Sequence, residues 1–226
     1  MARLARTVVA GLPHHVTRRG NRREAIFFED GDQEVYRDLL AEQTRKAGVE
    51  VWAYCLMPNH VHLILNPMRA DGLGLAVGEA HRRYTNFINA RGRWTGHLFQ
   101  SRFASVAMDE LHLLAAISYV SLNPVRAGLA GNAADWAWSS VRAHLAGKDD
   151  GLVTVRPVLD PDLPLSPVPE KHGERCTNHG LDASLARVFA LLVLSSETRE
   201  RSSGNTGREL PAGPRNSLIS PAQDLR

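Results

Sequence analysis

Hydrophobic positions along the first part of the chain recur with the spacing of helices in some segments and of strands in others. Residues from Asp32, a possible N-cap, to Gly48 carry apolar side chains at helical spacing with charged ones between them, which predicts an amphipathic helix. Another such segment begins after Asp109, again a possible N-cap. Pro124 is expected to limit it, because the residue before a proline avoids helical geometry. The same spacing predicts further helices over roughly 73–89 and 139–145.

Other segments have the composition of strands. The runs 49–56 and 60–65 are separated only by Met57, Pro58 and Asn59, and this short connection of turn-forming residues predicts an antiparallel hairpin. Two further stretches are expected to be extended, one over 10–17, before a basic turn at 18–23, and one over 98–108.

The character of the chain changes after Lys148. Prolines are frequent between residues 157 and 169, an apolar stretch follows, and the end is rich in Ser, Gly, Pro and Arg. We therefore expect one domain over residues 1–147. The remainder, 148–226, is expected to be a largely disordered extension with one possible helix near 182–195.

Composition narrows the class of protein without naming a function. The chain has 226 residues, of which 43% are hydrophobic and 23% charged, enough for one sizeable core. No run approaches the roughly 18 apolar residues of a membrane span, and no secretory signal begins the sequence, so we expect a cytoplasmic protein with no membrane association. Cys55 and Cys176 are far apart and lack a CxxC neighbour, which indicates neither a disulfide framework nor a zinc ribbon.

The charge of the chain is compatible with a polyanionic partner. The formal net charge is +3, and only three of the 27 basic residues are lysines. Residues 1–145 hold 17 basic and 13 acidic side chains, against 10 and 11 in the remainder, so the positive field belongs to the N-terminal part. Guanidinium groups suit bidentate phosphate contact, although an arginine bias also arises from genome base composition.

A His-x-His motif offers the first candidate chemistry. Side chains alternate along a strand, so His60 and His62 must point to one face while Val61 points to the other. Neutral imidazole is a common ligand of divalent ions, and two histidines leave coordination positions open for a substrate oxygen. An isolated motif of this kind is more often a satisfied polar pair than a metal site.

Tyr119 and Asn123 are the second group of residues that could take part in chemistry. They lie four residues apart on the predicted third helix and therefore share one face. A tyrosine hydroxyl, with a reference pKa of about 10, needs a nearby metal or base to act as a nucleophile at neutral pH. Taken alone, Tyr119 is more typical of a packing residue whose hydroxyl reaches the surface.

The remaining polar residues form no recognisable catalytic motif. No Gly-rich phosphate loop, Ser-His-Asp arrangement or HExxH motif occurs, and further histidines of the N-terminal part, among them His14, His15, His81, His97 and His112, are scattered. Arginines spread through the same part would suit phosphate contacts, with a solvated basic surface as the alternative.

Six segments in order give the chain a resemblance to a known family. The sequence resembles the transposases associated with repetitive extragenic palindromes (REPs), which are relatives of the insertion-sequence 200 single-tyrosine enzymes. The segments that carry this likeness are HVTRRGNRR with IFF (15–23 and 26–28), YCLMPNHVH (54–62), RYT (83–85), GHLFQSRF (96–103), YVSLNPVRAGL (119–129) and WAWSSV (136–141).

The resemblance implies an α+β, ferredoxin-like domain, in which an antiparallel sheet is backed by helices. It assigns a catalytic divalent metal, Mg²⁺ or Mn²⁺, to His60 and His62, with Asn123 as a further ligand, and it assigns the nucleophile to Tyr119. Family members tend to continue with a basic, glycine-rich segment that is not found here after Pro157. The residues expected to contact DNA are Arg18, Arg19, Asn21, Arg22, Arg23, Arg83, Arg102 and Arg126.

The function implied is a metal-dependent transposase that cleaves and rejoins single-stranded DNA beside hairpins or palindromes through a 5′-phosphotyrosine intermediate. A nucleoid-associated monomer is expected rather than a homodimer. Two alternatives remain open at this point, a hydrolytic metal-dependent nuclease and a non-catalytic protein that binds DNA hairpins.

Overall fold

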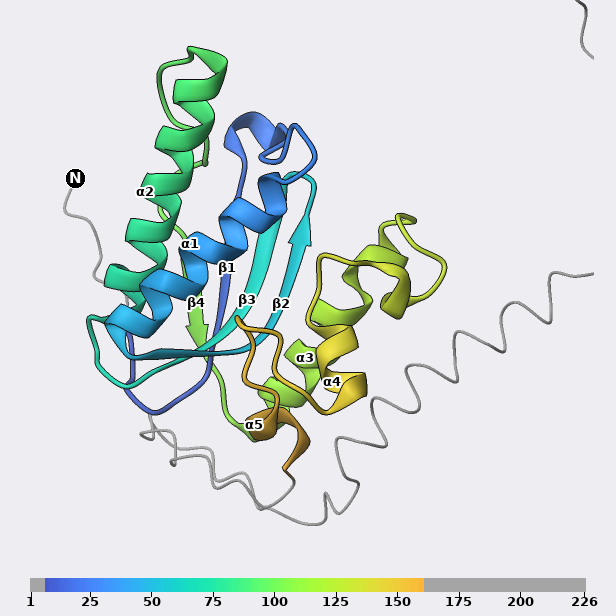
Figure 1. Cartoon of the computed structure of the whole chain (residues 1–226). Coiled ribbons are helices and arrows are strands. Elements are labelled where there is room, and N and C mark those ends of the chain that lie inside the picture. The colour runs from blue at the N-terminus through green and yellow to red at the C-terminus, as the bar shows by residue number, and fades with distance from the viewer. Residues whose placement is uncertain (1–6, 161–226) are drawn as a thin grey trace, which may run out of the picture.

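The computed structural model describes residues 7–160, and Figure 1 shows the order of their elements. The helix predicted near 182–195 and Cys176 lie outside the described residues. No helix of residues 7–160 is both long and apolar enough to cross a bilayer. The elements are β1 (His14–Arg19), η1 (Asn21–Arg23), α1 (Asp32–Ala47), β2 (Val49–Met57), β3 (His60–Pro67), α2 (Gly72–Gly92), β4 (Ala104–Ala107), α3 (Glu110–Arg126), η2 (Ala133–Asp135), α4 (Val141–Ala146) and α5 (Arg156–Leu159).

The four strands form one antiparallel sheet in the order β2-β3-β1-β4. Read with the helices between them, this is the β-α-β-β-α-β topology of ferredoxin-like domains, so the predicted fold class is confirmed. The hairpin joins β2 to β3 through Pro58 and Asn59, as the turn residues predict. Residues 98–108 are less regular than expected, since only Ala104–Ala107 form a strand.

The two faces of the sheet bury different helices. Leu63 and Leu65 of β3 belong to the larger hydrophobic core, which includes buried residues of α1 and α2. Ile64, which points the other way, packs in a smaller core with Ile117 and Val120 of α3. Figure 1 shows α1 and α2 on one side of the sheet and α3 on the other. Side-chain alternation along β3 therefore gives the sheet two different faces. One is covered by α1 and α2, and the other is only partly covered by α3.

A β-bulge in β2 keeps this division intact. The register against β3 shifts between Val51 and Ala53, so Trp52 and Ala53 both pack in the smaller core, whereas Val51 and Tyr54 pack in the larger one. The extra residue restores alternation for the rest of the strand.

Two predicted helix boundaries are wrong. Asp32 is the first residue of α1 rather than its N-cap, which is Gly31, in the left-handed region with φ 92°. The Asp32 carboxylate instead accepts hydrogen bonds from the backbone N–H groups of Phe28 and Glu29 and pairs with Arg91 of α2 at 2.6 Å. The predicted N-cap therefore ties the preceding loop and the end of α2 to the start of α1.

Pro124 does not end α3, which continues to Arg126. Proline is costly inside a helix because it lacks an N–H and crowds the preceding turn. Pro124 lies in the last turn of α3, where the cost in helix stability is limited because only two more residues follow it in the helix. The chain then closes through N–H bonds from Ala127 to the Asn123 carbonyl and from Leu129 to the Pro124 carbonyl. The predicted N-cap Asp109 is confirmed by its bond from the His112 N–H.

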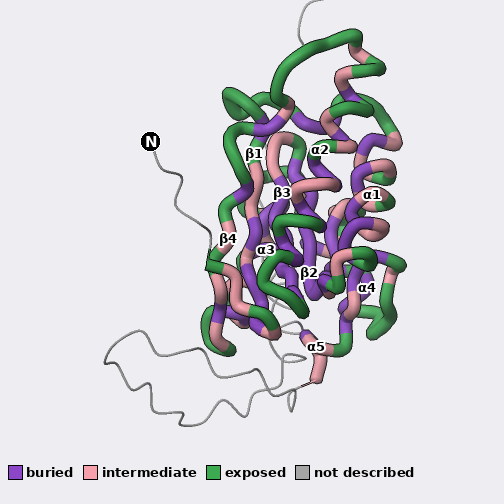
Figure 2. The backbone as a smooth tube through the Cα atoms, turned by 90° about the vertical axis from the view of Figure 1, so that its left-hand side faces the viewer, coloured by how far each residue is buried: buried purple, intermediate pink, exposed green. Residues whose placement is uncertain are grey.

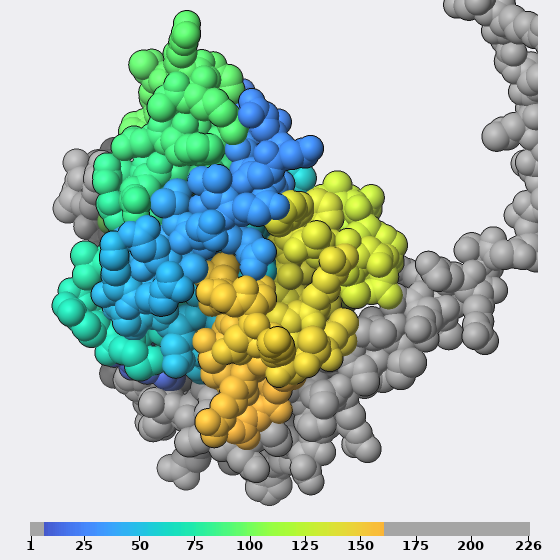
Figure 3. Space-filling view, in the orientation of Figure 1, coloured from blue at the N-terminus to red at the C-terminus, as the bar shows by residue number. Residues whose placement is uncertain are grey.

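Residues 149–160 pack on the domain, beyond the boundary expected at residue 147. Leu152, Val153 and Val155 join the larger core, and Val158 joins the smaller one. In Figure 3 this segment, coloured gold, fills the surface between α1 and α4. Its apolar residues form only a short run interrupted by Arg156 and Pro157, so the sequence pattern alone does not reveal a packed segment.

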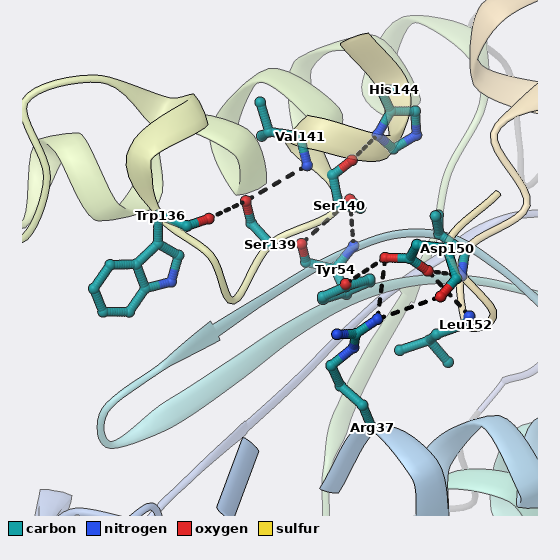
Figure 4. A network of polar contacts seen from close by, with 10 residues as sticks. Arg37, Tyr54, Trp136, Ser139, Ser140, Val141, His144, Asp150 and Leu152 are labelled. Carbon is teal, nitrogen blue, oxygen red and sulfur yellow. Dashed lines mark hydrogen bonds and ion pairs between the residues drawn. The ribbon is translucent and has the colours of Figure 1, made fainter. Parts of the chain in front are cut away.

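Asp150 fixes this segment through one carboxylate (Figure 4). One oxygen accepts the Tyr54 hydroxyl proton at 2.5 Å and lies 3.3 Å from the Arg37 guanidinium. The other accepts the backbone N–H groups of Leu152 and Val153 at 3.0 and 2.8 Å. Burial alone would raise the pKa of Asp150, but these hydrogen bonds and Arg37 outweigh it and hold the pKa below its ordinary value.

Replacing this carboxylate should destabilise the fold. We expect Asp150→Ala to lower the free energy of unfolding by about 2–3 kcal/mol, because charge-assisted hydrogen bonds are lost and Tyr54 keeps an unpaired hydroxyl. Urea unfolding would measure the loss, with Asp38→Ala, an exposed carboxylate on α1, as the matched control. Because the folded pKa is lowered, the difference from Asp150→Asn should be present at neutral pH and disappear as acid protonates Asp150. Equal stability of Asp150→Ala and Asp38→Ala would contradict this role.

Candidate active site

His60 and His62 lie on the sheet face that α3 partly covers. In the register of β1 and β3, His60 is opposite Arg19 and His62 is opposite Thr17. The two imidazole rings are 4.9 Å apart, centroid to centroid, and almost perpendicular. His62 is buried and His60 is half-buried. β3 therefore presents two imidazoles next to each other on one face, as the alternation of a strand requires.

α3 brings Tyr119 to these histidines. Ile117 and Val120 anchor the helix in the smaller core, and Tyr119, between them in sequence, stays 43% exposed. Its ring centroid is 5.3 Å from that of His62, in an edge-on arrangement. Figure 2 shows α3 lying over the strands with a largely exposed outer side. The phenol therefore lies at the edge of the helix, between the histidines and solvent.

Two further residues of α3 follow Tyr119 on the same side. Asn123, one turn later, is 9% exposed. Arg126, about two turns later, places its guanidinium carbon 5.5 Å from the centre of the Tyr119 ring, within the range of a cation–π contact. Arg126 therefore adds positive charge beside the phenol.

His15 is a residue of this cluster that sequence reasoning missed. It lies on β1, two residues before Thr17 and therefore on the same face. Its Nε2 is 3.0 Å from Nδ1 of His62, and its ring stacks on that of His62 at 5.2 Å. The Tyr119 ring is 6.2 Å away. The two-residue period of β1 indicates which of its side chains share a face with Thr17. It does not show that His15 meets His62, because that depends on the strand register, which places the two residues diagonally across from each other.

All three imidazoles are held in the neutral form. Burial lowers the pKa of His62 to about 3, with further contributions from His60, His15 and Arg19. Burial, followed by the charge of Arg19, lowers the pKa of His60 to about 4. Burial also lowers the pKa of His15. Neutral imidazoles carry the lone pairs that a metal ion needs, so no proton competes for these nitrogens near neutral pH.

The nitrogens of His60 and His62 fit a metal site. Nε2 of His62 is buried and has no hydrogen-bond partner among the described residues, which is costly for a polar atom unless something binds it. Nδ1 of His60 contacts the Asn59 amide oxygen at 2.6 Å, so it carries the proton and Nε2 is left with a lone pair. Within residues 7–160, no group of three His, Cys, Asp or Glu side chains is arranged to hold an ion. A bound ion would need ligands beyond these two.

The arginines expected to contact DNA divide between the two faces of the sheet. Arg19 lies opposite His60, and Arg126 contacts Tyr119. Arg18 points away from the histidines, and its guanidinium contacts His81 Nδ1 at 3.0 Å and the Ser101 carbonyl at 2.9 Å.

The remaining predicted DNA contacts lie farther from Tyr119. Arg83 on α2 pairs with Glu42 on α1 at 2.7 Å, on the covered face of the sheet. Asn21, Arg22 and Arg23 form the short turn η1 directly after β1 and are exposed. Arg102 is exposed in the segment before β4. Of the predicted set, the structure brings only Arg19 and Arg126 beside the histidines and the tyrosine.

The fold and this arrangement of side chains define an α+β domain of the transposase class. A family model described as "Transposase IS200 like" matches residues 8–123, and the chain belongs to this family. The match begins before β1 and ends at Asn123, so it covers every strand and most of α3. Family membership makes the protein a DNA-processing enzyme.

A solved structure with a similar fold is available for comparison. A REP-associated tyrosine transposase bound to a REP hairpin is similar with a TM-score of 0.55 and 22% identity, over 79% of this chain and 100% of that chain. A putative transposase from Deinococcus radiodurans R1 matches with a TM-score of 0.38 and 21% identity, over 53% and 95% of the two chains. No curated protein sequence matches the chain.

Proposed function

We propose that the protein is a metal-dependent transposase that cleaves and rejoins single-stranded DNA through a covalent bond to Tyr119. The observation that carries the proposal is the contact between the Tyr119 ring and His62, at 5.3 Å, in a chain of the IS200-like family. A nucleophile needs a group beside it that favours its ionised form. The histidine pair offers the place for such a group.

His60 and His62 would hold the ion, Mg²⁺ or Mn²⁺, through their Nε2 atoms, and Asn123 is proposed as a further oxygen ligand. When bound, the ion supplies positive charge that favours the phenolate of Tyr119 and offsets charge on the non-bridging phosphate oxygens. Asn59 holds the His60 ring in the required tautomer by accepting its Nδ1 proton at 2.6 Å.

The covalent step follows from the position of the phenol. The Tyr119 oxygen attacks the phosphorus in line with the leaving 3′ oxygen, and the phenol proton leaves to solvent at the exposed edge of α3. The bond from phosphorus to the 3′ oxygen breaks as the bond to tyrosine forms, and the 3′ oxygen takes up a proton from solvent, which leaves a 5′-phosphotyrosine and a free 3′-hydroxyl. Because bond energy is conserved, the reverse attack by another 3′-hydroxyl can rejoin strands without ATP.

We propose DNA with an unpaired segment beside a hairpin as the substrate. A structural neighbour is bound to a REP hairpin. Arg19 and Arg126 place positive charge beside the nucleophile, where a phosphate would lie. The histidines and the tyrosine come from one chain, so one copy of the protein carries a whole candidate site, which supports a monomer.

A covalent adduct tests this chemistry. With Mn²⁺ and labelled hairpin oligonucleotides, the protein should form a complex that survives denaturation, and Tyr119→Phe should abolish it. Phenylalanine keeps the ring that packs against His62 and Arg126, so DNA binding should change by no more than about twofold. Cleavage by Tyr119→Phe at the wild-type rate would show another nucleophile, and cleavage without any adduct would indicate a hydrolytic nuclease. Hairpin binding without cleavage in either metal would indicate a non-catalytic protein.

Metal binding tests the role of His15 separately from catalysis. For Nε2 of His62 to bind an ion, Nδ1 of His62 must carry the proton. This N–H then donates a hydrogen bond to Nε2 of His15, 3.0 Å away. We expect His15→Ala to weaken Mn²⁺ binding by about 10- to 100-fold, as measured by electron paramagnetic resonance titration. His15→Gln, whose amide oxygen can accept the same proton, should recover part of the loss.

The matched control is His112→Ala, which removes an exposed histidine of the first turn of α3 that pairs with Asp109. It should bind Mn²⁺ like the wild type, whereas His62→Ala should lose binding at this site. Wild-type affinity in His15→Ala would contradict the positioning role of His15.

A further inference from the structure

An exposed aromatic pair lies beyond the end of β1, outside the site described above. Trp94 is 52% exposed and Phe28 is 42% exposed, and their rings meet edge-on at 5.2 Å. A Cβ on Gly92 would lie 2.6 Å from the indole Cδ2, so the indole rests directly on this glycine. The backbone N–H of Trp94 also donates to the Asn89 carbonyl at 2.8 Å. A large aromatic side chain is therefore held in one place while half of it faces solvent.

The pair forms one wall of a pocket. The cavity has a volume of about 420 Å³, within the range of ligand sites in proteins. Polar groups surround the aromatic wall, including one carboxylate, which can accept hydrogen bonds from amino groups. The lining includes Asn21, Arg22, Glu24, Asn89, Trp94 and His97.

Arg22, which lines this pocket, and the adjacent Arg23 carry positive charge. Arg22 and Arg23 have left-handed backbone conformations, with φ of 52° and 65°, which are uncommon for residues with a side chain. Neither guanidinium forms an ion pair with another of the described residues. The turn thus leaves two arginines exposed beside an aromatic surface, the combination that binds a phosphate backbone and stacks its bases.

The same turn is bonded to the metal-site strand. Gly20, which follows Arg19, donates its N–H to the Asn59 carbonyl at 2.8 Å. The Asn59 side chain donates to the Arg23 carbonyl at 3.0 Å and, through its oxygen, contacts His60 Nδ1 at 2.6 Å. One side chain therefore joins the arginine turn to a candidate metal ligand. The turn that contributes Asn21 and Arg22 to the pocket is therefore connected to His60 through Asn59.

We infer that this pocket binds one unpaired base of the DNA strand, stacked on Trp94, with its neighbouring phosphates on Arg22 and Arg23. The inference rests on the proposed function, since it places the same strand whose phosphate reaches Tyr119. The base would be recognised through its face by the indole and through its edge by the polar lining. The subsite selects a splayed nucleotide, which a continuous duplex does not offer.

Photocrosslinking locates the base directly. The full chain is mixed with a pool of hairpin oligonucleotides that have short randomised flanks and one 5-iododeoxyuridine at a chosen flank position. After irradiation, peptide mass spectrometry should find crosslinks to Trp94 or Phe28 for at least one flank position. Retention of the pool with crosslinks only outside the pocket would overturn the inference.

Affinity measurements separate stacking from simple hydrophobic contact. Fluorescence anisotropy with the same pool should show binding weakened roughly 5- to 150-fold in Trp94→Ala, the cost of one lost stacked base, and by much less in Trp94→Phe. Gly92→Ala should also weaken binding, because the new methyl group displaces the indole without removing it. The matched control is Leu75→Ala, an exposed apolar residue at the opposite end of α2, which should bind like the wild type.

Measuring the Tyr119 adduct as well as affinity distinguishes failure of the base subsite from failure of the proposed transposase function. If Trp94→Ala binds the oligonucleotide pool with wild-type affinity and still forms the Tyr119 adduct, the base subsite is contradicted but the proposed function is not. Failure of the wild type to bind the pool at all would contradict both. Unchanged thermal unfolding of Trp94→Ala and Gly92→Ala would show that their losses come from the pocket.

Discussion

The antiparallel register between β1 and β3 is the constraint on which the candidate site depends. It places Thr17 opposite His62 and Arg19 opposite His60, and it brings His15 diagonally to His62. A shift of one residue would move one set of side chains to the covered face. The register is itself held by burial, since Val61, Leu63 and Leu65 of β3 must face the larger core. Core packing on one face therefore determines the chemistry on the other.

The second element of the site is the incomplete cover that α3 gives to the open face. Ile117 and Val120 bury the helix on Ile64, and the positions around them leave Tyr119 at the border with solvent. Full cover would exclude a DNA strand, whereas no cover would leave the imidazoles hydrated and easier to protonate. Burial lowers the pKa of both His60 and His62, while Tyr119 at the open edge stays exposed. The same compromise appears at Trp94, which is fixed on Gly92 but half exposed.

Sequence patterns predicted the elements better than their partners. The hairpin of β2 and β3, the helical spacing of α1 and the N-cap Asp109 depend on neighbours in the sequence, and the structure confirms them. The roles of Asp32, His15 and Asp150 depend on partners far along the chain. No pattern among neighbouring residues could therefore predict these roles. The aromatic pocket likewise joins two stretches that are far apart in the sequence, 21–28 and 89–98. The resemblance directed attention to His60, His62 and Tyr119, but only the register and the packing of α3 bring their rings together.

Anomalous diffraction from crystals of the full chain soaked in Mn²⁺ would test the central claim most directly. We expect one strong peak within bonding distance of Nε2 of both His60 and His62, roughly 2.0–2.3 Å from each, with the Tyr119 hydroxyl facing it. A hydrogen bond from Nδ1 of His62 to His15 should remain in that structure. A peak bound elsewhere, with the two histidines free of metal at saturating Mn²⁺, would contradict the account.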